Sequence, residues 1–134
     1  MSDEFITYST AQVNKEYPPF EFELIEERIK DYLAAVQDDN PYYDQQREAP
    51  ATIAAVYARW SMISGHRIQP GNIHAKQHYK FFKAVSPGQR LKTIGKVVDK
   101  YMKKENKCLE LETHTYDEAG DLVAISRMMC IGPE

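Results

Sequence analysis

Cysteine and glycine are scarce in this sequence. Its 134 residues include only two cysteines, Cys108 and Cys130, and no glycine occurs before Gly65. Two cysteines cannot build a disulfide framework, and no CxxC or CxxH spacing indicates a zinc site. We therefore expect two free, buried thiols in a reducing cytoplasm, and no metal site. The first 64 residues also lack the residue type that usually allows a backbone to approach a ligand closely.

Long apolar runs are absent as well. The opening MSDEFITYST is acidic and polar, unlike the basic and then apolar start of a signal peptide. No stretch is long enough to predict a membrane span. Hydrophobic residues make up 43% of the chain and charged residues 28%, which is typical of a globular protein in water. We expect one domain over residues 1–134, with residues 1–16 lying loosely on its surface.

The net charge of −3 hides an uneven distribution of charge. Residues 1–50 carry twelve acids and four bases, whereas residues 59–107 carry twelve bases and two acids. Such a basic segment can attract a phosphorylated cofactor, an anionic membrane surface or nucleic acid, or it can be the solvated side of a pair of strands. The pI of about 5.8 and the lack of any nucleic-acid-binding signature argue against nucleic acid.

A short strand and a helix are predicted before a compact turn. Residues 20–25, FEFELI, alternate apolar and acidic side chains, which predicts a strand. Residues 26–37 then carry apolar side chains at helical spacing. The helix should end there, because Asn40 precedes a proline and is pushed out of the helical region. Residues 38–44, DDNPYYD, predict a structured turn.

A second helix is predicted over residues 51–64. It is apolar almost all round, so the rest of the protein should enclose it, and Gly65 suits its end. Arg59 interrupts the apolar surface. A buried arginine needs a partner, so an ion pair with an acid such as Asp38 or Asp44 is expected. Small residues at helical spacing would let another element approach closely: Ala51, Ala55 and Ala58.

The second half of the chain predicts an antiparallel sheet. Strand-like runs follow one another with short links, and Glu118-Ala119-Gly120 is a hairpin turn signal. The expected strands are 73–85, 90–104, 107–117 and 121–132. A sheet of sequential strands wrapped around one apolar helix is an α+β architecture.

Two segments resemble motifs of the MaoC-like dehydratases, including their fatty-acid-synthase-type relatives. QDDNPYYD at 37–44 is similar to the family's Gly-Asp-x-Asn-Pro-x-His, and KAVSPGQRL at 83–91 is similar to its Pro-Val-x-x-Gly-Asp-x-Leu turn. The resemblance implies a hot-dog fold and subunits that pair, with a copy or with a relative, by joining their sheets. It also implies an acyl thioester of coenzyme A or acyl carrier protein as substrate or ligand, without a further cofactor.

The chemistry that the resemblance implies is reversible loss or addition of water between 3-hydroxyacyl and 2-enoyl thioesters. The family's catalytic Asp falls on Asp38 and its Asn on Asn40, whereas Tyr43 occupies the position of the His. A tyrosine, with an ordinary pKa of about 10, donates a proton at neutral pH but is a poor base. Backbone amides at the helix start, near Ala49 and Ala51, would hold the thioester oxygen.

Each candidate residue also has a structural interpretation. Asp38 is either the surviving catalytic acid or the residue that orders the turn after the helix, and Tyr43 either contacts substrate or packs under that turn. Arg59 can reach a phosphate or the thioester. The same phosphate-binding role, or plain solvation, is open to the basic strand residues Lys76, Lys80, Lys83, Arg90 and Lys92. The missing base could be replaced by one of four histidines, or all four could be ordinary polar residues: His66, His74, His78 and His114.

Three functions therefore stay open. The chain is a hydratase or dehydratase subunit that lacks a complete catalytic pair and acts with a related catalytic subunit, or it is a self-sufficient hot-dog hydratase or thioesterase that uses Asp38. The third hypothesis is a non-catalytic module that binds acyl coenzyme A. His74 and His78, four apart in a predicted strand, are expected on one face of it.

Overall fold

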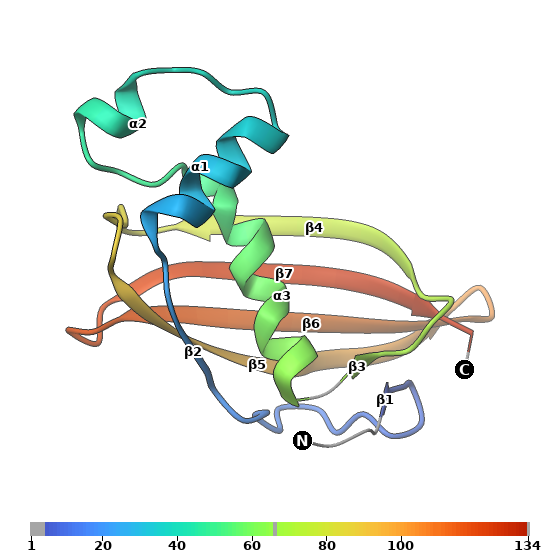
Figure 1. The fold of residues 1–134 in the computed structure, drawn as a ribbon. Helices are drawn as coiled ribbons and strands as arrows, with labels where there is room; N and C mark the ends of the chain where they lie inside the picture. Colours follow the sequence, from blue (N-terminus) through green and yellow to red (C-terminus); the bar gives the residue numbers. More distant parts are fainter. Residues whose placement is uncertain (1–4, 66, 134) are drawn as a thin grey trace.

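A curved antiparallel sheet packs against one long helix in the computed structural model, which describes residues 5–65 and 67–133 (Figure 1). The sheet has the strand order β2-β5-β6-β7-β4. Its strands are β2 (Phe20–Glu23), β4 (Ile73–Phe81), β5 (Arg90–Lys103), β6 (Asn106–Asp117) and β7 (Leu122–Gly132). The helices are α1 (Glu26–Ala35), α2 (Tyr42–Gln45) and α3 (Ala54–Gly65), and the 3₁₀ turn η1 (Ala51–Ile53) leads into α3. The predicted α+β hot-dog architecture is confirmed.

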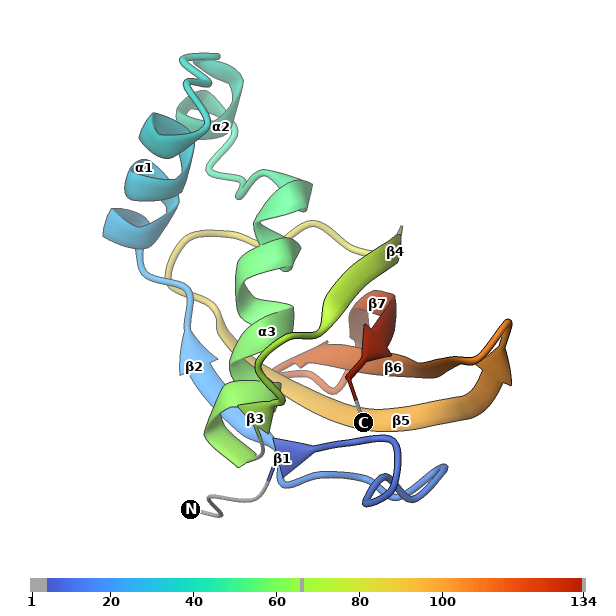
Figure 2. The ribbon, with the colours of Figure 1, turned by 90° about the vertical axis from the view of Figure 1, so that its right-hand side faces the viewer.

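Alternating residues of the long strands bury one face of the sheet. Leu91, Thr93 and Val97 of β5 are at most 1% exposed, while Lys92, Ile94 and Lys96 alternate with them and are less buried. The buried hydroxyls of Thr93 and Thr115 lie opposite each other and are 2.8 Å apart, so they satisfy each other within the core. Figure 2 shows the sheet curving around α3 on this buried side. The hairpin predicted between β6 and β7 is present, and Gly120 adopts the left-handed φ of 85° that its turn requires.

The central helix is only partly covered by its own chain. Ile53, Ala54, Tyr57 and Ala58 are buried, but Ala51, Ala55, Val56 and Arg59 are exposed. The prediction that this helix is enclosed is therefore wrong for that stripe. The expected burial and ion pairing of Arg59 are wrong too, since no ion pair joins it to Asp38 or Asp44 in the part of the chain that the structure describes. The reason is geometric: a five-stranded sheet curves around one side of a helix, and β4 ends the sheet before it closes.

The N-terminal segment is packed rather than loosely placed. Within its described part, β1 (Phe5–Ile6) pairs in parallel with β3 (Arg67–Ile68). Ile6 and Ala11 are only 3% and 4% exposed. The Nζ of Lys100 donates to the carbonyls of Tyr8 and Ala11 at 2.9 and 3.1 Å. The sequence prediction for residues 1–16 was wrong for this part because the contacts are long-range and leave no local period. Residues 1–4 lie outside the described structure.

Both cysteines are buried and free, as predicted. Burial raises the pKa of the Cys130 thiol, so this group is a small apolar core residue rather than a reactive thiolate. Across residues 5–65 and 67–133, no helix has both the length and the apolar character to span a membrane.

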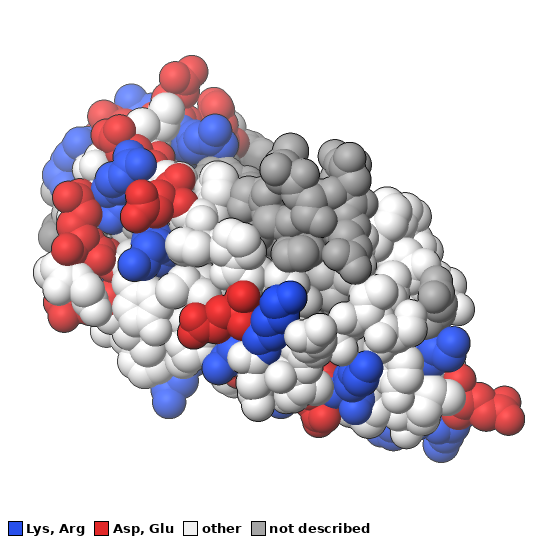
Figure 3. All heavy atoms as spheres, turned by 90° about the horizontal axis from the view of Figure 1, so that it is seen from below, with Lys and Arg blue, Asp and Glu red and all other residues white. Residues whose placement is uncertain are grey.

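Surface charge is mixed on the face seen from below in Figure 3. Acidic and basic side chains are interspersed there and are densest toward the upper left end of the view. Some of the opposite charges are paired: Arg47 contacts Glu26 at 2.7 Å near α1. The excess of bases in residues 59–107 therefore does not make this face of the molecule uniformly basic.

Candidate functional site

A cavity of about 290 Å³ opens where the chain enters the central helix. One side is the segment Glu48 to Ala51, and the other is the end of β4 with the residues that follow it, including Phe82 and Lys83. Its apolar wall contains Ile53, Tyr57, Phe81, Val85 and Val123. A mostly apolar cavity with a few polar groups at its rim suits an acyl chain that ends in a polar head.

One backbone amide at the helix start is suited to an oxygen ligand. The amide of Ala49 already donates to the carbonyl of Val85 at 2.7 Å. The first bond within the 3₁₀ turn runs from the amide of Ile53 to the carbonyl of Pro50 at 3.1 Å. The amide of Ala51 precedes that bond and has no acceptor within the helix. It also lies at the positive end of the helix, where a backbone amide favours an oxygen acceptor.

Lys83, at the rim of the cavity, is held by the carboxylates of Asp117 and Asp121. The Nζ of Lys83 lies 2.6 Å from Asp117 and 2.9 Å from Asp121. These hydrogen bonds raise the pKa of Lys83 to about 12, with the bond to Asp117 the largest cause. Asp117 also accepts the amides of Ala119 and Asp121 at 3.0 Å each, so it ties the β6–β7 turn to the cavity. An ammonium that two acids neutralise is a poor receptor for a phosphate, so Lys83 orders the rim.

This ion pair predicts a pH dependence of stability. The Lys83 ammonium lowers the pKa of Asp117, so the pair stabilises the folded state above the unfolded value near 3.8 and is lost as the pH falls below it. Asp117→Asn should therefore be less stable than the wild type at pH 7, and the gap should close on acidification. Urea unfolding from pH 7 to pH 3 checks this. A gap that stays constant over that range would show that charge is not involved.

The turn predicted over 38–44 is stabilised by its own side chains. The carboxylate of Asp38 accepts the amide of Asn40 at 3.1 Å, and the side-chain oxygen of Asn40 accepts the amide of Tyr42 at 3.0 Å. The Tyr42 hydroxyl donates to Glu48 at 2.9 Å, which connects the turn to the cavity. The ring of Tyr43 packs edge-on against that of Tyr42, with centroids 5.5 Å apart. The helix α2 begins within this turn, extends one residue past it and was not predicted.

The turn and the cavity are separate in this structure. Glu48, Ala49 and Ala51 line the cavity, while Asp38, Asn40 and Tyr43 are not among its lining residues. Figures 1 and 2 show α1 and α2 extending beyond the end of α3, away from the sheet. Among the residues assigned from the family resemblance, Ala49 and Ala51 at the helix start line the cavity, whereas Asp38 and Tyr43 do not.

A matched pair of substitutions tests the structural role of Asp38. Asp38→Asn keeps the acceptor oxygen, so the free energy of unfolding should change by less than about 0.5 kcal/mol. Asp38→Ala removes the acceptor and should cost about 1 kcal/mol. Thermal and urea unfolding of the two variants check this. Equal effects of the two would contradict the assigned hydrogen bond.

The family model for the FAS1-like dehydratase domain region matches residues 11–126. The chain belongs to this family. Among solved structures, it is similar to the R-hydratase PhaJ1 from Pseudomonas aeruginosa, with 20% identity, a TM-score of 0.81, and 98% of this chain and 88% of that chain covered. No curated protein sequence shows significant similarity to it.

Two further structures that this dehydratase-family chain resembles are complexes of two chains from Mycobacterium tuberculosis. One is the 3R-hydroxyacyl-ACP dehydratase complex HadBC, at 17% identity and a TM-score of 0.78, with 92% of this chain and 98% of that chain covered. The other is the ChsH1-ChsH2 complex, at 15% identity and a TM-score of 0.71, with 87% of each chain covered. At these identities the similarity establishes the fold.

The histidines of this dehydratase-family chain lie apart from the cavity where they are described. A β-bulge between His74 and Lys76 shifts the register, so that His74 pairs with Cys130 but His78 pairs with Arg127. Directly opposite residues share a face, so the two histidines lie on opposite faces, and the prediction of a shared face was wrong. His114 hydrogen-bonds Glu112 on the outer face. His66 lies outside the described residues.

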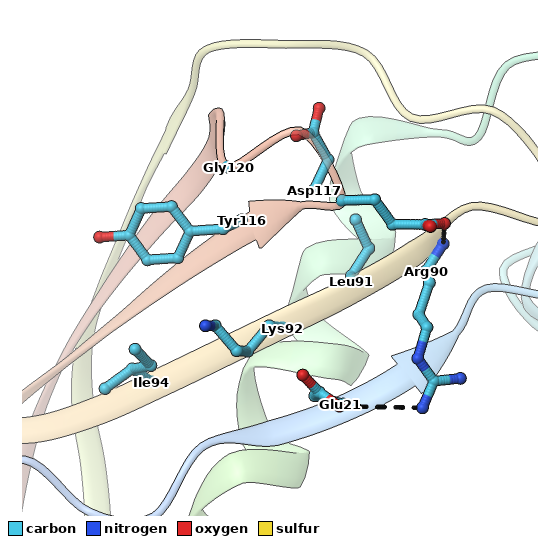
Figure 4. Close-up of a pocket in the computed structure, with 9 residues that line it drawn as sticks. Glu21, Arg90, Leu91, Lys92, Ile94, Tyr116, Asp117 and Gly120 are labelled. Atoms are coloured by element: carbon cyan, nitrogen blue, oxygen red, sulfur yellow. Dashed lines mark hydrogen bonds and ion pairs between the residues drawn. The ribbon is translucent and has the colours of Figure 1, made fainter.

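The basic side chains considered for phosphate binding are also dispersed. Arg90 and Lys92 lie on the outer face of β5, at an open hollow of about 560 Å³ (Figure 4). There Arg90 contacts Glu21 at 3.9 Å, and its amide donates to Glu118. Lys76 and Lys80 follow the opposite edge of the sheet, on β4. Only Lys83 reaches the cavity at the helix start.

Two features of the cavity were missed by sequence reasoning. Burial raises the pKa of Tyr57 to about 12, so its phenol stays protonated, and its ring lines both this cavity and a second one of about 230 Å³ beside α1. No local pattern distinguishes Tyr57 from other apolar helix residues. The contact of Lys83 with Asp117 and Asp121 could have been predicted. Antiparallel pairing of β4 with β7 places the residues after Phe81 beside those before Leu122.

Proposed function

We propose that the chain is a subunit of an acyl-thioester hydratase or dehydratase that binds its thioester at the start of α3 and depends on a related subunit for a complete acid–base pair. The carrier would be coenzyme A or acyl carrier protein, with no other cofactor. The observation that carries the proposal is the composition of the cavity: apolar walls and the Ala51 amide, but no histidine among the described residues that line it. Family membership supplies the reaction class.

Adding or removing water beside a thioester needs one group to take a proton and another to give one. Among the lining residues, Lys83 is held by Asp117 and Asp121, and Glu48 accepts the hydroxyl of Tyr42. Asp38, the family's acid, is engaged in its turn, and Tyr43 stands in place of the basic histidine. The cavity therefore has groups that can bind a thioester, but its described lining residues lack a free pair of groups for proton transfer. This supports a binding role in which a partner subunit supplies the acid and the base.

A partner subunit is supported by two features. The similar HadBC and ChsH1-ChsH2 structures are each complexes of two chains. The exposed stripe of α3, which includes Ala55 and Val56, leaves apolar surface for another chain to cover. Pairing through joined sheets, as implied by the family resemblance, would place a second chain along β4.

The experiment is a complementation assay with crotonyl coenzyme A. A related chain with an intact Asp-x-Asn-Pro-x-His motif is assayed for hydration with and without this chain. The expected result is faster hydration in the mixture than with the catalytic chain alone. An unchanged rate in the mixture would contradict the subunit role. Release of free thiol by this chain from acyl coenzyme A would point to a thioesterase instead.

A further inference from the structure

Strand β4 forms a free edge of the sheet. It pairs with β7 on one side, and no strand of the described residues pairs with its other side. Eight of its nine residues are exposed, and only Tyr79 is half-buried. A free edge presents unpaired backbone amides and carbonyls over its whole length, which is a template for another strand. Lysine on such an edge can simply repel other strands, so the surroundings of the edge have to decide whether one docks there.

Apolar surface flanks this edge. Ile73, Phe81 and Phe82 are 61%, 44% and 47% exposed. The rings of Tyr79 and Phe81 stack at 5.9 Å on the side that faces α3. An edge that serves only to stay solvated has no need of exposed aromatic side chains beside it. The combination indicates an edge that another chain covers.

The outward-facing row of β4 is basic and unneutralised. Lys76, His78 and Lys80 lie opposite Met129, Arg127 and Ile125 of β7. Arg127 is already neutralised by Glu110 at 3.0 Å and Glu112 at 3.5 Å. Within the described ranges no acid lies at ion-pair distance from Lys76 or Lys80, and the sequence contains no acid at all between Glu48 and Asp99.

This row disfavours pairing of β4 with a second copy of itself. A two-fold axis would make the two β4 strands antiparallel within one continuous sheet. Residues directly opposite each other then point to the same face. In registers centred between residues 76 and 80, the row of Lys76, His78 and Lys80 therefore faces the same row of the copy, so lysine meets lysine or histidine. Like charges directly opposite destabilise a strand pair.

We infer that the chain pairing with β4 is a different hot-dog subunit, whose edge strand carries acidic side chains opposite Lys76 and Lys80. The inference deepens the proposed subunit role and depends on it. A basic edge attracts an acidic edge and repels a copy of itself. Together these two effects favour the mixed dimer over either homodimer.

The test uses a charge-reversed form of this chain as the acidic edge. The wild type, a Lys76→Glu/Lys80→Glu variant and their equimolar mixture are compared by sedimentation at an ionic strength of about 0.05 M, where screening is weak. Each protein alone should be monomeric. The mixture should form a heterodimer with a dissociation constant at least about tenfold below that of either self-association, and about 0.5 M salt should reverse this.

A matched control separates edge pairing from bulk charge. Lys92→Glu/Lys103→Glu makes the same change in net charge on β5, away from the edge, and its mixture with the wild type should stay monomeric. A wild-type dimer as strong as the mixed one, a mixture that does not associate, or association of the control mixture would each overturn the inference. Sedimentation measures association and does not depend on thioester binding. A failure of the proposed function would instead appear in the complementation assay with crotonyl coenzyme A.

Discussion

Ala51→Pro is expected to weaken binding of an acyl thioester about tenfold while leaving the fold intact. Proline removes the one amide that we assign to the thioester oxygen, and a tenfold loss corresponds to about 1.4 kcal/mol, the scale of one hydrogen bond. The site tolerates proline because Ala51 is the first residue of its turn, where no intrahelical bond is lost. Pro50 before it already has the extended angles, φ −62° and ψ 135°, that a following proline requires.

Ala51→Ser is the matched control for this substitution, since serine retains the amide at the same position. Calorimetry with butyryl coenzyme A should give a tenfold weaker constant for the proline variant and a value within about twofold of the wild type for serine. Urea unfolding should place both within about 0.5 kcal/mol of the wild type. Wild-type affinity in the proline variant would remove Ala51 from the site, whatever the rest of the cavity does.

Leu24→Ala is expected to lower the free energy of unfolding by about 2–5 kcal/mol. Leu24 is 1% exposed and joins the core cluster under α1 and α3. Its backbone is fixed on both sides, because its amide donates to Gln89 at 2.9 Å and its carbonyl accepts from Gly88 at 2.8 Å. The site therefore has little freedom to collapse into the space that the leucine leaves.

The neighbouring residue supplies the control for that substitution. Ile25 has the same number of side-chain carbons but is 38% exposed. Ile25→Ala should cost less than about 1 kcal/mol in the same urea titration. Similar losses at the two positions would mean that Leu24 is not the core residue described here.

Local patterns were enough to predict most of the secondary structure. Alternation in FEFELI and helical spacing after it place β2 and α1, and the apolar run from Ala51 places η1 and α3. Short links between the last strands predict the antiparallel meander of β5, β6 and β7. Each of these features is set by contacts between residues close in sequence or one strand away, which a single chain displays as periodicity.

Features that depend on distant contacts could not be predicted in this way. The packing of Ile6 and Ala11 depends on β3 and on Lys100. A single extra residue in β4 reverses the facing of His74 relative to His78. The exposure of Arg59 follows from where the sheet ends, not from the helix that carries it. The assignments of Asp38, Asn40 and Tyr43 came from a motif, and they stay predictions until the turn is tested with a bound thioester.

The measurement that tests the account most directly is to give the purified chain crotonyl coenzyme A and to follow binding by calorimetry and hydration by loss of the enoyl absorbance in the same preparation. The account predicts saturable binding that Ala51→Pro weakens, with no hydration above the uncatalysed rate. Robust hydration by the chain alone, abolished by Asp38→Ala, would contradict it and make the chain a self-sufficient hydratase. Absence of binding would equally contradict the assigned site.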